Sequence, residues 1–98
     1  MAEEDKIDVF VVEIGSTADF HLLEPIVNKV KGTKLVEGYG GQTREIWTLN
    51  KAKLEQVKAK LAKTHISRII CIVSMSREDY NCGIARPGRG CVISQNFV

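Results

Sequence analysis

Apolar residues along the chain are grouped in runs that predict alternating strands and helices. The β-branched run Ile7–Ile14 and the run Ser67–Met75 predict strands with apolar side chains on both faces. Both runs are far shorter than the roughly 18 apolar residues that a membrane helix needs. Two shorter strand candidates, Thr33–Glu37 and Thr43–Leu49, flank a glycine-rich turn and predict a hairpin.

The first helix is expected between the first two strands. Its apolar residues have the spacing of one helical face, and they are Phe20, Leu23, Ile26, Val27 and Val30. Because Pro25 cannot donate a backbone hydrogen bond, the regular helix either begins near Glu24 or is kinked there. Gly32 is expected to end it.

The second helix is expected from Lys51 to about Lys63, with Asn50 as its N-cap. Its apolar residues face inward and its lysines outward; the apolar residues are Leu54, Val57 and Leu61. The element order is then β-α-β-β-α-β. This order predicts an α+β fold, the ferredoxin-like or split-βαβ sandwich.

The strand over Ser67–Met75 would lie at a sheet edge in that fold. An edge strand that is apolar on both faces needs a cover, because an exposed one would pair with other chains. We expect either that Cys91–Val98 pairs as a fifth strand or that another subunit covers the edge. We therefore expect the chain to form a homo-oligomer, most simply a dimer or trimer. We expect residues 1–98 to be a single domain, with 1–6 frayed and 76–98 a loop plus a possible C-terminal strand.

Composition supports one globular core. The chain has 98 residues, of which 44% are apolar and 27% are charged, so it belongs to neither the disordered nor the membrane-spanning class. Three of its first five residues are acidic where a signal peptide would be basic. We therefore expect a cytoplasmic protein without membrane insertion.

The net charge is only +2, which argues against a dedicated nucleic-acid-binding protein. The charge is unevenly distributed, however. Residues 1–24 hold seven acidic groups and one basic group, whereas residues 25–98 hold five acidic and thirteen basic groups. This basic remainder predicts an anionic ligand or partner. The alternative is that the lysines only keep the helix faces hydrated.

The first candidate site is the sequence Gly38-Tyr39-Gly40-Gly41-Gln42. Its glycines would let backbone N–H groups approach a ligand closely, as they do in phosphate-binding loops. The amide of Gln42 could contact a base edge or a carbonyl group. The alternative is an ordinary glycine-rich hairpin turn.

The second candidate site is a turn-rich segment bounded by Cys82 and Cys91. It contains Arg86 and Arg89, which could bind a phosphate or carboxylate group. A disulfide between the two bounding cysteines would act as a redox switch in a reducing compartment. Cys71, in the apolar last strand, is expected to be a small core residue. The alternative for the segment is a solvated tail.

A metal site has little support in the sequence. His21, His65, Cys82 and Cys91 could supply four ligands, but no two of them have the short spacing of a zinc site. We predict no metal and no required cofactor.

Catalytic motifs are missing as well. The sequence contains no Ser-His-Asp order, no Cys-His motif and no phosphate-binding Walker loop. Asp8 and Glu13 are five positions apart on one strand, an odd separation, so they lie on opposite faces and cannot form a carboxylate pair. We predict that the protein is not an enzyme.

The segment Val36-Glu37-Gly38-Tyr39-Gly40-Gly41-Gln42 resembles the Gly-aromatic-Gly-x-Gln motif at the base of the T-loop in the nitrogen-regulatory PII superfamily. The resemblance covers residues 7–49, with a further similarity at 82–91. It implies the ferredoxin-like fold, a homotrimer and adenine nucleotides bound in clefts between subunits. It also implies that Gly40 and Gln42 line the cleft.

The segment Cys82–Cys91 resembles a longer version of the Cys-bounded glycine loop found in some PII-like proteins of the carboxysome and bicarbonate-transport group. By that resemblance Arg86 and Arg89 would contact phosphate. The chain lacks the long T-loop and the Thr-Gly-x-x-Gly-Asp-Gly-Lys loop of the family. The resemblance therefore implies neither ordinary ATP binding nor control by uridylylation.

These observations lead to three functional hypotheses. The first is a PII-like signalling protein that binds a small anionic ligand or an adenine nucleotide through Gly38, Gly40, Gly41, Gln42, Arg86 and Arg89, and contacts a protein partner. The second is a protein-interaction or inhibitor module without a small ligand, in which Val92–Val98 adds a strand to a partner's sheet. The third is an RNA-binding domain that stacks bases on Trp47 and Tyr39, although Trp47 is better explained as core.

Overall fold

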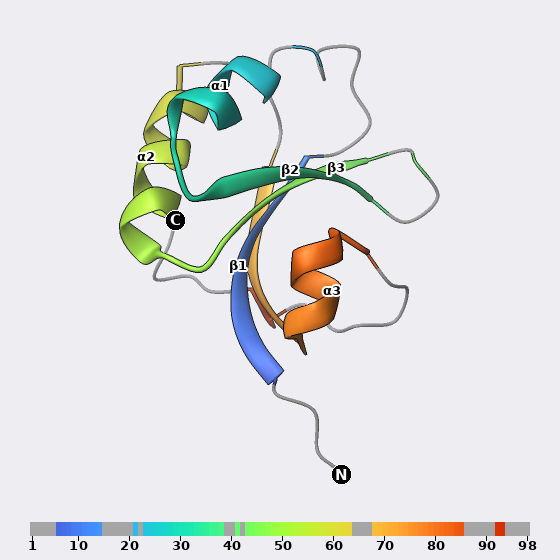
Figure 1. Ribbon diagram of the computed structural model, residues 1–98. Helices are drawn as coiled ribbons and strands as arrows, with labels where there is room; N and C mark the ends of the chain where they lie inside the picture. Colours follow the sequence, from blue (N-terminus) through green and yellow to red (C-terminus); the bar gives the residue numbers. More distant parts are fainter. Residues whose placement is uncertain are drawn as a thin grey trace, which may run out of the picture.

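Five strands and three helices make up the described part of the chain (Figure 1). The structure, a computed structural model, describes residues 6–14, 21, 23–38, 41, 43–63, 68–85 and 92–93. The strands are β1 (Lys6–Ile14), β2 (Thr33–Glu37), β3 (Arg44–Thr48), β4 (Arg68–Ser76) and β5 (Val92–Ile93). The helices are α1 (Leu23–Lys29), α2 (Lys51–Leu61) and α3 (Arg77–Cys82).

The strands form one antiparallel sheet in the order β2-β3-β1-β4-β5. The first six elements follow the order β1-α1-β2-β3-α2-β4, so the predicted α+β, ferredoxin-like arrangement is confirmed. β1 is the central strand and pairs with β3 on one side and β4 on the other. α3 and β5 are added after this unit.

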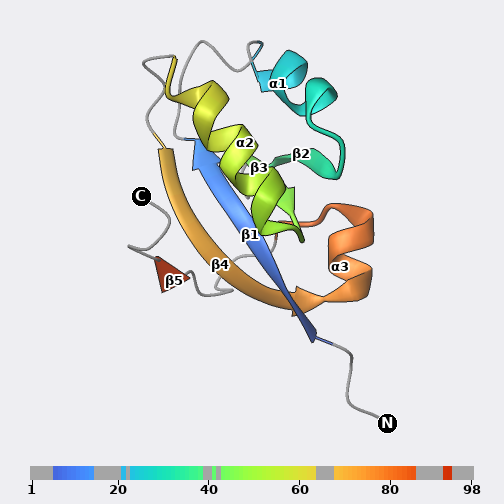
Figure 2. The same cartoon turned by 90° about the vertical axis from the view of Figure 1, so that its left-hand side faces the viewer.

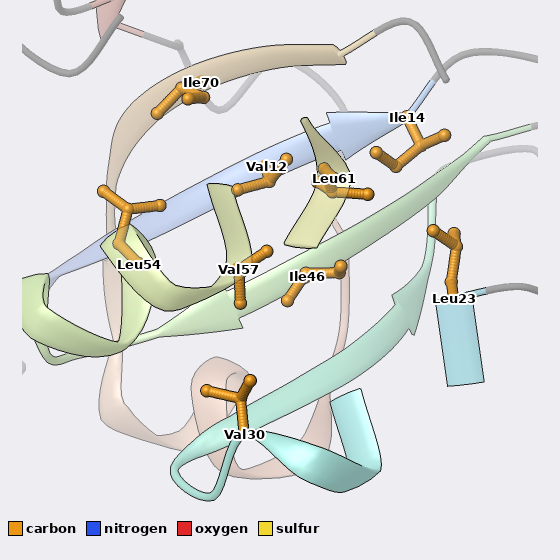
Figure 3. Close-up of a cluster of buried hydrophobic side chains, with 9 residues drawn as sticks. All are labelled: Val12, Ile14, Leu23, Val30, Ile46, Leu54, Val57, Leu61 and Ile70. Atoms are coloured by element: carbon orange, nitrogen blue, oxygen red, sulfur yellow. The ribbon is translucent and has the colours of Figure 1, made fainter. Parts of the chain in front are cut away.

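Helices α1 and α2 cover one face of the sheet. Leu54, Val57 and Leu61 of α2 are fully buried and point toward the strands (Figure 3). They pack with Val12 and Ile46, among other residues of the same core cluster. This confirms the predicted inward face of the helix.

The ends of the two helices follow from capping residues. The side-chain oxygen of Asn50 accepts a hydrogen bond from the Ala52 N–H at 2.8 Å, which confirms it as the N-cap of α2. α2 ends at Leu61, about two residues earlier than predicted. Pro25 lies in the first turn of α1, where its missing N–H costs no helical hydrogen bond, and Gly32 follows α1 with a φ of 88°.

Helix α3 covers the opposite face of the sheet, across from α1 and α2 (Figure 1). That face is a second core: Val9, Val11, Trp47 and Val73 have no exposed surface, and Tyr80 of α3 packs against them. The described helices include none long and apolar enough to cross a bilayer.

Helix α3 corrects the expectation of a loop at this point of the chain. The Ser76 hydroxyl caps the helix by accepting the Asp79 N–H at 3.1 Å, and Gly83 ends it with a φ of 70°. A Ser-x-x-Asp start and a glycine stop are helix signals that the sequence contains. The loop prediction was wrong for residues 77–82 because these two capping interactions and the packing of Tyr80 on the sheet stabilise a short helix there.

The C-terminal strand β5 lies beside β4 (Figure 2). Cys71 pairs with Ile93 and Ile72 pairs with Val92. The fifth strand expected from the sequence is therefore confirmed over these two residues, and the chain itself covers this part of the β4 edge. At the other terminus, Lys6 already belongs to β1, and the rest of the segment expected to be frayed lies outside the described residues.

Candidate functional site

The glycine turn joins β2 to β3 and is closed by its own backbone. The N–H of Gly38 donates to the carbonyl of Thr43 at 3.0 Å, and the N–H of Gly41 donates to the carbonyl of Gly38 at 2.9 Å. Gly41 has a φ of 79°, and a Cβ on Gly38 would overlap the Thr43 hydroxyl, so both positions require glycine. These two N–H groups are used within the turn. Gly40 and Gln42 lie outside the described residues.

Arg44 places a positive charge at this turn. Its Nη1 donates to the carbonyls of Gly41 at 3.1 Å and Thr43 at 2.9 Å, and lies 3.8 Å from a carboxylate oxygen of Glu37. Because the Glu37 side chain is mostly exposed, the ion pair itself contributes little. The guanidinium group therefore acts mainly by holding the turn, a role that the glycine motif did not indicate.

The cysteine-bounded segment differs from its expected pairing. Cys82 is an exposed free thiol at the end of α3, so the disulfide considered between Cys82 and Cys91 is not formed. Cys71 is buried, as expected, but is disulfide-bonded. The register pairs Cys71 with Ile93, so the C-terminal strand lies beside Cys71. Arg86, Arg89 and Cys91 themselves lie outside the described residues.

A buried carboxylate lies on the sheet face that α3 covers. Glu45 is only 2% exposed, and its Oε1 accepts a hydrogen bond from Trp47 Nε1 at 2.8 Å. Glu13 is the direct neighbour of Glu45 on β1. Two carboxylates in directly opposed positions of a sheet repel each other, so the indole donor compensates part of that cost. Period-two alternation places Glu45 and Trp47 on one face, so the sequence held a signal for this pair.

Trp47 also forms the surface against which α3 packs. The Tyr80 ring stacks on Trp47 with centroids 6.1 Å apart and planes inclined by 22°. The Nζ of Lys34 lies 4.3 Å from the Tyr80 ring centroid and donates to the Tyr80 carbonyl at 2.6 Å. Since Trp47 is fully buried beneath these groups, its predicted role as core is confirmed, and it offers no exposed ring for base stacking.

Replacing Lys34 with methionine should loosen α3. Methionine keeps an unbranched side chain only one atom shorter, but it removes the charged donor to the last turn of α3 and the cation–π contact, so we expect a loss of about 1–3 kcal/mol in the free energy of unfolding. Trp47 is the sole tryptophan, so its fluorescence should shift toward longer wavelength at the same time. Lys31→Met, at an exposed position before β2, is the control. An unchanged emission spectrum in Lys34→Met would contradict this role of Lys34.

Among the residues that the structure describes, no three His, Cys, Asp or Glu side chains gather as ligands for a metal ion. His21 is exposed, and His65 lies outside the described ranges. No protein-family model matches the chain, and neither a curated protein nor a solved structure is significantly similar to it.

Proposed function

We propose that the chain is a non-enzymatic regulatory module of PII-like type. It binds an adenine nucleotide or another small anionic ligand between the subunits of a homo-oligomer, with a trimer favoured, and signals the bound state to a protein partner. The proposal places the protein in the cytoplasm and requires no cofactor.

The observation that supports the proposal is the glycine turn at the end of the β2–β3 hairpin. It occupies the place in a ferredoxin-like sheet where the PII resemblance puts its ligand-contacting residues, and Arg44 holds it in a defined shape. The hydrogen bonds of Gly38, Gly41 and Thr43 within the turn lower the conformational entropy that these residues would lose when a ligand binds.

The roles of the site residues follow from the contacts within the turn. Because the N–H groups of Gly38 and Gly41 are engaged, these two glycines shape the turn. In the proposal, the ligand is contacted by the backbone of Gly40 and the side-chain amide of Gln42, and its negative charge is bound by Arg86 and Arg89.

Calorimetry with AMP, ADP, ATP and cyclic nucleotides tests this function, together with native mass spectrometry for subunit number and retained ligand. We expect saturable binding to an oligomer by at least one of these nucleotides. The double substitution of Arg86 and Arg89 with glutamine should weaken binding at least about tenfold, because two charge-assisted contacts are lost. Arg77→Gln, an exposed arginine at the start of α3, should leave it unchanged.

Two results would count against the proposal. One is the absence of heat with every nucleotide at millimolar concentration. The other is a monomer in native mass spectrometry that nevertheless binds nucleotide, since the site would then not lie between subunits.

A further inference from the structure

Two adjoining hollows lie on the helical layer of the molecule. The first has a volume of about 200 Å³ and is lined by Pro25, Ile26, Lys29, Lys60 and Lys63. The second has a volume of about 220 Å³ and is lined by Gln56, Ala59, Lys60 and Lys63. Lys60 and Lys63 line both. We refer to the first hollow, with its three lysines from two helices, as the lysine hollow.

The spacing of residues along α2 explains why the lysines gather there. Positions 53, 56, 60 and 63 are separated by three, four and three residues, so they lie along one flank of the helix. The side chain of Lys53 lies in the space that a Cβ on Gly32 would approach, three residues after the end of α1, so this flank faces the end of α1. Lys29, at the end of α1, completes the set from the other side.

The opposite flank of α2 is different. There Lys58 Nζ lies 3.4 Å from Glu55 Oε1. Over the described residues, by contrast, no acidic side chain forms an ion pair with Lys29, Lys60 or Lys63. Within the described residues, the lysine on one flank of α2 has a carboxylate partner, whereas the lysines on the flank that faces α1 have none.

Three lysines without a carboxylate partner among the described residues line one hollow, and their ammonium groups repel one another. Each lysine near a helix C-terminus interacts favourably with the helix dipole, but this explains the residues singly and not their convergence on one space. An anion in the hollow would replace the repulsion with three attractive contacts.

We propose that the lysine hollow is a binding site for two or three adjacent phosphate groups, as in pyrophosphate or the phosphate chain of a nucleoside triphosphate. Its volume is below the roughly 300–1,000 Å³ of sites that enclose a whole drug-sized ligand. It therefore fits the phosphate groups alone. Lysine suits this role because its ammonium group binds phosphate as a compact point charge.

This site is independent of the glycine turn, because it is built from α1 and α2 and uses none of the residues of the proposed nucleotide site. Its lysines are also only partly buried or exposed, so they are accessible to a ligand. The net charge of +2 and the small extent of the cluster favour a compact anion over a long nucleic acid.

Calorimetry on the full chain at low ionic strength tests the proposal with four probes: pyrophosphate, orthophosphate, ATP and AMP. We expect the lysine hollow to bind one pyrophosphate or one triphosphate group per chain, in addition to any nucleotide at the glycine-turn site, and to bind orthophosphate and AMP at least about tenfold more weakly because they offer a single phosphate. Lys60→Gln and Lys63→Gln should each weaken pyrophosphate binding about tenfold. Lys58→Gln, on the paired flank of the same helix, should change it less than about twofold.

Circular dichroism melting of each variant establishes that the fold is retained. We expect this because none of the three substituted lysines, Lys58, Lys60 and Lys63, is fully buried. Equal weakening by Lys60→Gln and Lys58→Gln would overturn the site, as would the absence of pyrophosphate binding. Pyrophosphate binding that is undiminished in the Lys60→Gln and Lys63→Gln double variant would also overturn it, whereas ATP binding that persists there while pyrophosphate binding is lost would belong to the glycine-turn site and would support the lysine hollow as the pyrophosphate site. Binding of a single-stranded RNA that pyrophosphate does not displace would point to a different class of ligand and would overturn it as well.

Discussion

Trp47→Ala is expected to destabilise the protein by about 3–5 kcal/mol, the usual cost of removing a large buried aromatic side chain. Trp47 has no exposed surface, supports the Tyr80 ring and donates its indole N–H to Glu45. Its loss would leave a cavity under α3 and a buried carboxylate without that donor. Because small domains have total stabilities of about 5–15 kcal/mol, the change removes a large share of the whole.

Denaturant unfolding followed by far-ultraviolet circular dichroism measures this loss, since the variant has no tryptophan to report. Leu49→Ala is the matched control: it is a large-to-small change one residue beyond β3 at an exposed position, and it should cost far less. Trp47→Phe keeps most of the ring but not the N–H donor and should fall between the two. A Trp47→Ala variant within about 1 kcal/mol of the wild type would show that α3 does not pack on this face in solution.

Leu54→Ala should cost about 2–5 kcal/mol, because it empties a fully buried position between α2 and the sheet (Figure 3). Gln56→Ala, at an exposed position of the same helix, should be neutral or slightly stabilising because alanine is the better helix former. Thermal unfolding provides the measurement, and domains of this size shift by about 4–8 °C per kcal/mol.

The same pair of variants separates stability from ligand binding. Gln56 lies on the lysine flank of α2 and Leu54 on its buried face. Leu54→Ala should lower the melting temperature without changing pyrophosphate affinity at a temperature where the variant is folded. Similar melting temperatures for Leu54→Ala and Gln56→Ala would be inconsistent with the packing of α2 described above.

Much of the fold could be predicted because its signals are local and repeated. Thr33–Glu37 was predicted with the bounds that the structure gives, and Asn50 and Gly32 marked helix ends through capping chemistry that depends on neighbouring residues alone. The apolar character of the Ser67–Met75 run led to two alternatives, a covering C-terminal strand or a covering subunit, and the first is confirmed over the two residues of β5.

Contacts between side chains that are far apart in the sequence could not be predicted. Neither Lys34 nor Tyr80 stands out in its own segment, and their contact depends on where α3 lies on the sheet, 46 residues away along the chain. The spacing of the cysteines left a Cys82–Cys91 disulfide open, whereas in the structure Cys82 is free and Cys71 is disulfide-bonded. In the glycine turn, composition indicated free N–H groups, whereas the folded turn engages those of Gly38 and Gly41.

The central position of β1 has a consequence for how the protein is made. β1 is synthesised before both of its partners, which begin only at Arg44 and Arg68. Until β4 has emerged from the ribosome, β1 lacks one of its two pairing strands. Its apolar residues then remain exposed on the nascent polypeptide, where a chaperone could bind them. Translation stopped before β4 should therefore yield an insoluble fragment.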